Sequence, residues 1–241
     1  MQSQWLVLAV FFLVLATDHF VFWRHFERAA ALDPTRARRT LWLQWMLMLW
    51  ACAGLVLAFS AAHELPLSAL WLEPPTGPRL WVPLALTVGI VALQFQGWLK
   101  VARMQDKTPV RGQFGDAGRI LPHTTSELPA WLLASLTAGF CEELLFRAFL
   151  VWIFQPFVGV WIAAIAALAV FVVAHAYQGA KGMIQCAVLG GILTAIMLLS
   201  HSLWPAVVLH AAIDWMAGWT AWLVLREPVE PSPGRDAVQA R

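Results

Sequence analysis

Long apolar stretches recur along the whole chain and limit what it can fold into. Seven of them, each 18 to 24 residues long, lie at 4–23, 42–61, 80–98, 130–153, 157–177, 183–200 and 204–225. An α-helix needs about 20 apolar residues to cross the hydrocarbon core of a bilayer. Only 12% of the 241 residues are charged, about half the share in a typical soluble domain. The sequence therefore predicts an all-α protein, a polytopic transmembrane helical bundle with about seven (seven to eight) membrane-spanning helices.

Basic residues gather in alternate loops and predict the orientation in the membrane. Five arginines lie between residues 24 and 39, and the third loop, 99–128, carries a second basic group. The intervening loops, 62–78, 154–156 and 201–203, contain no Lys or Arg. Because cytoplasmic loops are enriched in Lys and Arg, we expect the N-terminus outside and the C-terminus in the cytoplasm.

Cysteine usage and loop composition exclude several classes of function. Cys52, Cys141 and Cys186 all fall inside apolar runs, which argues against a disulfide framework. The sequence has no zinc-finger spacing, no glycine-rich phosphate loop and no basic stripe. We therefore expect the lipid bilayer, and no nucleic acid, among the partners.

Two adjacent carboxylates and an arginine lie inside the apolar run from Pro129 to Phe154: Glu142, Glu143 and Arg147. A charge at the centre of a bilayer costs about 2.5–3.5 kcal/mol, so these groups need partners. Glu143 and Arg147 are four residues apart, which predicts an ion pair on one helical face. Glu142 is rotated by one residue, so we expect it to face elsewhere and to stay free for chemistry. The alternative is that all three are structural.

Two later apolar stretches each carry a histidine in a polar cluster. Phe171 and His175 share a helical face, so the phenyl ring would shield the imidazole or fix its rotamer. His210 and Asp214 are also four residues apart, and an intramembrane aspartate needs a partner, for which His210 or a metal is the natural choice. The alternatives are an interfacial histidine at 175 and a His–Asp pair that only joins helices.

Together the clusters place a carboxylate, two histidines and an aspartate on three helices. Such a set can bind and deprotonate a water molecule, with Glu142 as general base and then acid. Glu142, His175 and His210 also match a Zn²⁺ site with an open position for water. The sequence leaves both chemistries open, one with Zn²⁺ and one with no cofactor.

The three clusters follow one another as EExxxR, FxxxH and HxxxD. This arrangement resembles the CPBP family, which comprises the type II CAAX prenyl endopeptidases and their bacterial relatives (the Abi, or CAAX protease self-immunity, proteins). The resemblance covers about residues 125–220. The first three apolar stretches carry no motif that matches it.

The resemblance implies an intramembrane endopeptidase that hydrolyses a peptide bond of a membrane-associated protein or peptide. In such a protein Glu142 and His175 would activate water, and His210 and Asp214 would stabilise the oxyanion or help to hold a metal. Glu143 and Arg147 would form a supporting ion pair. The family has been described both as metalloproteases and as metal-free glutamate proteases, and the resemblance does not decide between them.

The apolar stretches, the resemblance and the Pro-rich polar composition after Arg226 together predict an organisation and a location. We expect N-terminal transmembrane helices and cytoplasmic loops over 1–124, a catalytic transmembrane core over 125–225 and a disordered cytoplasmic tail over 226–241. The expected location is a bacterial cell inner membrane.

Two other classes of function compete with the protease. One is a non-catalytic membrane scaffold or immunity protein with the same fold. The other is a proton-coupled transporter, which would favour an internal repeat, and the sequence shows none.

The predicted spans also pose a geometric difficulty. At 1.5 Å of rise per residue, His175 and His210 would differ in depth by about 10 Å. Helix tilt, a kink at Gly190-Gly191 or shifted span boundaries must close this gap for a common site to form.

Overall fold

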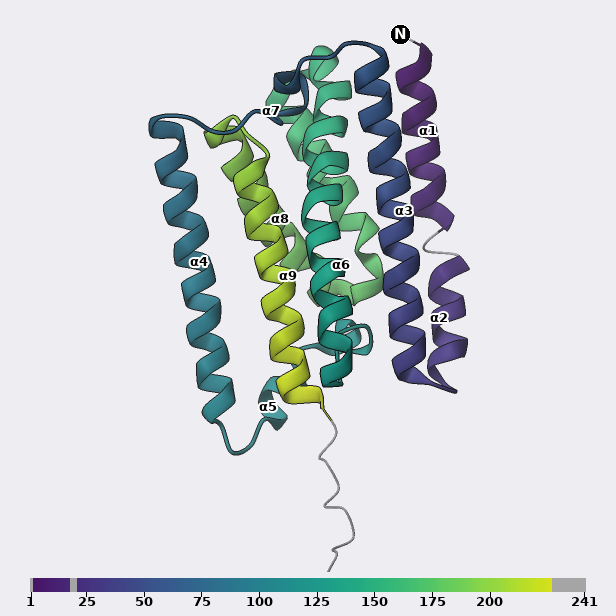
Figure 1. Cartoon of the computed structure of the whole chain (residues 1–241), viewed down its shortest axis with the longest axis vertical. Coiled ribbons are helices and arrows are strands. Elements are labelled where there is room, and N and C mark those ends of the chain that lie inside the picture. Colours follow the sequence, from purple (N-terminus) through teal and green to yellow (C-terminus); the bar gives the residue numbers. More distant parts are fainter. Residues whose placement is uncertain (1, 18–20, 227–241) are drawn as a thin grey trace, which may run out of the picture.

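The structure is a computed structural model that describes residues 2–17 and 21–226, and over these residues it is helical without a strand (Figure 1). The helices and short helical turns in chain order are α1 (Gln2–Thr17), α2 (Trp23–Ala30), α3 (Pro34–Ala62), η2 (Leu67–Leu70), α4 (Pro78–Arg103), α5 (Thr108–Arg111), η3 (Gly115–Arg119), η4 (Thr125–Glu127), α6 (Leu128–Glu142), the π-helical η5 (Glu143–Phe149), α7 (Leu150–Ala174), η6 (Ala176–Gln178), α8 (Gly179–Ser200) and α9 (Trp204–Leu225).

Several of these segments have the length and composition of membrane spans. Within the described residues, five are long and apolar enough to cross a membrane: Pro34–Ala62, Pro78–Arg103, Thr125–Ala174, Ala176–Ser200 and Trp204–Leu225. The chain is therefore an all-helical protein with the composition of an integral membrane protein.

At the two ends of the chain, the structure either differs from the prediction or does not describe the residues concerned. The predicted span 4–23 corresponds to a shorter apolar helix, Gln4–Leu15. Residues 18–20 of that span and 227–241 of the predicted tail lie outside the described part of the chain.

The long segment Thr125–Ala174 reverses direction at Gly159. Gly159 has φ 77° and ψ 162°, a conformation open mainly to glycine, and it interrupts α7. The rings of Phe146 and Phe171 nevertheless lie with centroids 5.2 Å apart. These residues are about 25 positions apart, which would be about 37 Å in a straight helix. The limb from 160 to 174 therefore runs back along η5.

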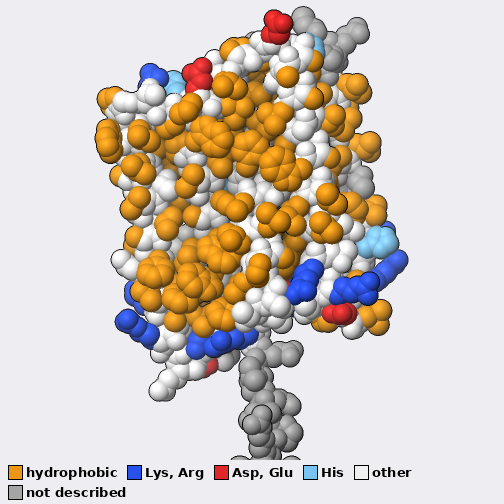
Figure 2. Space-filling model, viewed as in Figure 1, with side chains coloured by type: hydrophobic (Ala, Val, Ile, Leu, Met, Phe, Trp, Pro, Cys, Tyr) orange, Lys and Arg blue, Asp and Glu red, His pale blue; other side chains and the backbone are white. Residues whose placement is uncertain are grey.

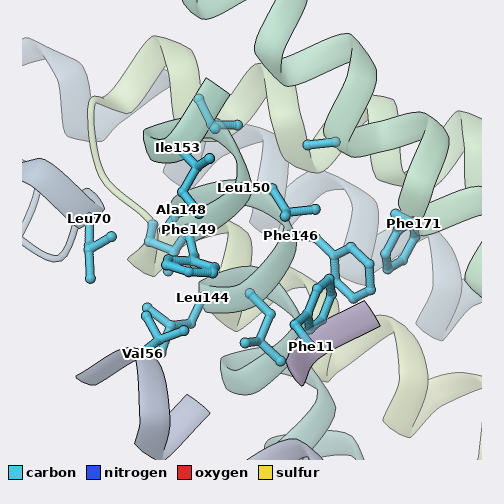
Figure 3. Packing of buried hydrophobic residues seen from close by; sticks show 14 of the residues in the cluster. Phe11, Val56, Leu70, Leu144, Phe146, Ala148, Phe149, Leu150, Ile153 and Phe171 are labelled. Atoms are coloured by element: carbon cyan, nitrogen blue, oxygen red, sulfur yellow. The ribbon is translucent and has the colours of Figure 1, made fainter. Parts of the chain in front are cut away.

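The π-helical segment η5 lies at the centre of the main hydrophobic core, and all seven of its residues are buried. Figure 3 shows its side chains packed among residues from four other elements: Phe11 of α1, Val56 of α3, Leu70 of η2 and Phe171 of α7. A helical segment that is covered on every side has no lipid-facing face. Its charged residues must therefore find partners inside the bundle.

The helices α6 and α9 occupy the middle of the bundle, and α4 stands at one edge, packed on α8 and α9 (Figure 1). A close approach of α6 to α9 occurs at Gly139. A Cβ there would lie 2.8 Å from Ala211 Cβ and 3.0 Å from the Val207 carbonyl oxygen. This glycine brings the end of α6 next to the part of α9 that carries His210.

Charged and apolar side chains are segregated on the surface. In the view of Figure 2, apolar side chains cover most of the face, and Lys and Arg gather along the edge where α5 lies. Exposed apolar side chains on α4 and α7 include Trp81, Leu93, Trp161 and Ile165, each more than 60% exposed. So large an apolar surface suits contact with lipid.

Candidate active site

Glu142 and Glu143 lie at the junction where α6 becomes π-helical. Such π-helical turns are rare and occur frequently at functional sites. Arg147 Nη1 lies 2.9 Å from Glu143 Oε1, and both side chains are at most 2% exposed. The predicted Glu143–Arg147 ion pair is therefore confirmed. The Arg147 guanidinium also lies over the Phe171 ring, 3.9 Å from its centroid.

Glu143 also fixes His210. The Nδ1 atom of His210 donates a hydrogen bond of 2.7 Å to Glu143 Oε1 across the α6–α9 contact. Asp214, which the spacing predicted as the partner of His210, lies farther away, with Oδ2 3.7 Å from Nε2. That distance is too long for a hydrogen bond. The predicted pairing of Asp214 with His210 is therefore present as a longer ion pair, whereas the hydrogen bond that orients the ring comes from Glu143.

His175 ends α7 and is held by Phe171. Its Nδ1 lies 2.8 Å from the Phe171 carbonyl oxygen, and the two ring centroids are 4.4 Å apart. A carbonyl oxygen can only accept, so Nδ1 carries the proton and Nε2 presents its lone pair. The predicted packing of Phe171 on His175 is confirmed.

Three polar atoms converge at the end of α6. Glu142 Oε2 lies 3.8 Å from His175 Nε2 and 3.9 Å from His210 Nε2. This oxygen is buried and has no hydrogen-bond partner among the described residues. Separations of this size leave room for one water molecule within about 2.8 Å of two of the atoms.

The expected difference in depth between His175 and His210 is not present. Both imidazoles contact the same oxygen of Glu142. The limb of α7 after Gly159 has only about 15 residues, so it extends about 22 Å and ends before it could cross a core of about 30 Å. The predicted span 157–177 was too long, and His175 lies deeper in the bundle than that span implied.

The converging atoms line a cavity of about 860 Å³. Glu142, His175, His210 and Asp214 form part of its wall, and α3 and α4 supply mostly apolar side chains. The cavity extends to Gln113 and Phe114 in the segment between α4 and α6. It is large enough for several residues of a peptide.

Residues 124–216 match the family model described as Rce1-like, type II CAAX prenyl endopeptidase Rce1-like. This part of the chain, less than half of its length, is similar to the Rce1-like family. The resemblance drawn from the three motifs is thereby confirmed, and all three motifs lie inside the matched residues. A protease family implies a protein or peptide substrate. Neither the curated proteins nor the solved structures gave a match.

The Rce1-like region carries the donor set that Zn²⁺ prefers, in Glu142, His175 and His210. Zinc bonds of 2.0–2.2 Å place tetrahedral ligand atoms about 3.3–3.6 Å apart. The separations of 3.8 and 3.9 Å from Glu142 Oε2 are wider. Among the described residues, no group of three His, Cys, Asp or Glu has the spacing to hold a metal ion. The donor chemistry fits zinc and the spacing does not.

The Rce1-like region does not supply the whole cavity. Gln94 and Trp98 of α4, which lies outside residues 124–216, also line it. The motif pattern missed both residues. The sequence held only a weak signal for one of them, because Gln94 is one of two glutamines, with Gln96, in this apolar span.

Proposed function

We propose that this chain is an intramembrane endopeptidase of the glutamate type that hydrolyses a peptide bond of a membrane-associated protein or peptide. The observation that carries the proposal is the buried, unpartnered Glu142 Oε2 facing the Nε2 atoms of His175 and His210 on the wall of the cavity. A buried polar atom without a partner is costly, so its retention favours a role with water or substrate.

The first step is attack by water. A water molecule between Glu142 and His175 donates its hydrogens to Glu142 Oε2 and to His175 Nε2, which leaves an oxygen lone pair for the scissile carbonyl carbon. Glu142 takes a proton as the C–O bond forms. It then gives that proton to the amine nitrogen as the C–N bond breaks.

The residues of the third motif, His210 and Asp214, would stabilise the oxyanion. In its doubly protonated form, His210 keeps Nδ1–H on Glu143 and offers Nε2–H to the carbonyl oxygen that gains charge. Asp214, with Oδ2 3.7 Å from His210 Nε2, stabilises the imidazolium. Glu143 and Arg147 act as positioning residues, because they hold His210 and do not touch the reacting atoms.

We also propose seven transmembrane segments with a cytoplasmic C-terminus, one of which, the limb from 160 to 174, enters the hydrocarbon core without crossing all of it. The reversal at Gly159 divides Thr125–Ala174 into two limbs, and α1 adds one more span to the five long segments. An odd number agrees with Figure 1, where α1 begins at one end of the bundle and α9 ends at the other. The edge rich in Lys and Arg would face the cytoplasm of a bacterial inner-membrane protein.

The test is to compare new protein termini in membranes of bacterial cells that express wild type, Glu142→Gln or Glu73→Gln. Glu73 is exposed and does not line the cavity, so its variant is a matched control. We expect termini that appear with wild type and with Glu73→Gln but fall about 10²–10⁴-fold with Glu142→Gln, the usual contribution of a general base. If Glu142→Gln generated the same termini, the glutamate mechanism would be wrong.

The non-catalytic scaffold makes the opposite prediction in this experiment. A scaffold or immunity protein would produce no new termini and would tolerate the isosteric Glu142→Gln. A proton-coupled transporter would likewise produce none, although Glu142→Gln would disturb it.

A further inference from the structure

One face of α4 forms a wall of the cavity. Gln94, Gly97, Trp98 and Val101 line the cavity, and their spacing of three, four and seven residues places them on one helical stripe. The rest of this helix is largely exposed and apolar. The stripe faces the same space as Glu142 and His210.

Two polar atoms of this stripe are buried without partners. Neither Gln94 Oε1 nor Trp98 Nε1 has a hydrogen-bond partner among the described residues. Leaving such a group unsatisfied costs about 1–3 kcal/mol. The Trp98 ring is stacked on Trp219 with centroids 4.3 Å apart, so its indole N–H is held in place. Two residues that line the cavity thus carry one donor and one acceptor without partners.

Gly97 leaves open space between these two groups. A Cβ added at Gly97 would meet no atom within 4 Å. No other side chain or backbone therefore fills the space directly next to α4 at Gly97, between Gln94 and Trp98.

An extended peptide carries the hydrogen-bonding groups that Gln94 and Trp98 are missing. Its backbone N–H and C=O groups must find partners when they leave water for an apolar cavity, whereas those of a helix are already paired. Residues 94 and 98 are separated by about 6 Å of helical rise, close to the repeat of about 6.7 Å between alternate residues of a strand. Trp98 N–H can donate to a peptide carbonyl, and Gln94 Oε1 can accept from a peptide N–H.

We propose that α4 is the substrate-binding wall, on which Gln94 and Trp98 hydrogen-bond the main chain of an unwound, extended peptide and present it to Glu142. This inference rests on the proposed function. It adds that α4, outside the Rce1-like region, selects segments of substrate that are not helical.

The test uses purified protein and an internally quenched ten-residue peptide, selected by its cleavage from a mixed synthetic peptide library. Gln94→Met and Trp98→Phe remove the polar atoms and keep the bulk of each side chain. Gln96→Met and Trp81→Phe are matched controls on the same helix, since both residues are exposed and lie outside the cavity lining. We expect KM to rise about 3- to 10-fold for each cavity variant, the loss of about one hydrogen bond, with little change in kcat or in the controls.

Measurements of peptide binding test the role of α4 separately from the proposed catalytic function. In the Glu142→Gln background, adding Gln94→Met should weaken binding of the same peptide by the same factor. A set of peptides with one N-methylated amide at successive positions should include one that loses affinity for the protein with Gln94 but not for the protein with Gln94→Met. Equal affinities for all these proteins would overturn the role of α4. Undiminished cleavage by Glu142→Gln would overturn the proposed function and leave the binding result to stand by itself.

Discussion

Glu143 and His210, which are 67 residues apart in the chain, are joined by a hydrogen bond of 2.7 Å between Oε1 and Nδ1. The same Oε1 atom lies 2.9 Å from Arg147 Nη1. One carboxylate oxygen thus links the first and third motifs. The arrangement makes Glu143 responsible both for neutralising Arg147 and for aiming His210.

The ion pair should therefore affect stability and activity separately. We expect Arg147→Met to lower the free energy of unfolding by about 3–5 kcal/mol, because it leaves Glu143 buried without its cation. Glu143→Met together with Arg147→Met should recover much of this loss but remain inactive, since His210 Nδ1 has lost its acceptor. Unfolding in detergent and peptide cleavage measure the two effects.

The exposed pair Arg119–Glu27 supplies the control for this experiment. Its atoms lie 3.4 Å apart and both side chains are 46% exposed. Arg119→Met should change stability by less than about 1 kcal/mol. If Arg147→Met were no more destabilising than Arg119→Met, the buried pair would not have the importance assigned to it.

Two neighbouring glycines of α8 should respond differently to alanine. A Cβ at Gly190 would lie 2.9 Å from Arg147 Nη2 and 2.8 Å from Leu168 Cδ1, whereas one at Gly191 would meet only Leu168 Cδ2 at 3.9 Å. We expect Gly190→Ala to cost about 1–3 kcal/mol of stability by overpacking and to reduce cleavage at least tenfold by displacing Arg147. Gly191→Ala should match wild type in both assays, and similar losses in the two variants would refute this account of Gly190.

Chelation tests the role of metal. Because Glu142, His175 and His210 are spaced too widely for zinc, we expect purified protein to keep its cleavage rate after treatment with a strong chelator and removal of the chelated metal. Loss of activity that added Zn²⁺ restores would contradict this expectation. It would show that the three side chains close around an ion.

The segment before α6 should make stability depend on pH. Burial lowers the pKa of His123 from its ordinary value of 6.5, and the charge of Arg38 acts in the same direction, although the hydrogen bond to the Gly118 carbonyl opposes both. The unfolded chain therefore takes up this proton first as the pH falls. The contribution of His123 to stability is complete above pH 6.5 and declines as the pH falls through 6.5 towards the lower folded-state pKa.

The measurement is the thermal midpoint of unfolding at several pH values across this window. The midpoint should fall less in His123→Gln than in wild type as the pH is lowered. The exposed His25 provides the comparison, and His25→Gln should follow wild type. Identical pH profiles for all three proteins would contradict the prediction.

Local patterns in the sequence were sufficient to predict the helical class, the pairing of Glu143 with Arg147 and the packing of Phe171 on His175. Each of these depends on residues at most four positions apart in one helix. The hydrogen bond from His210 to Glu143 depends on how the end of α6 approaches α9, which no spacing within one helix can reveal.

The reversal between the fourth and fifth apolar stretches was predicted at 154–156 and lies slightly later, at Gly159. Only a boundary between two apolar stretches was visible there, and it did not show that the second limb would stop short. For α4, periodicity identified an apolar span, but it could not show that Gln94 and Trp98 would share a cavity with motifs from the other half of the chain.

The length of the short limb after Gly159 also fixes the position of His175 along the bundle. One extra helical turn in it would move His175 by about 5.4 Å, beyond reach of Glu142, and one turn fewer would place it at the level where Phe171 packs on Phe146, beside the π-helical segment. Under the proposed function, the number of residues between Gly159 and His175 sets how far below the membrane surface a bond must lie to be cut. Substrates would then be chosen partly by the depth at which their helix can unwind.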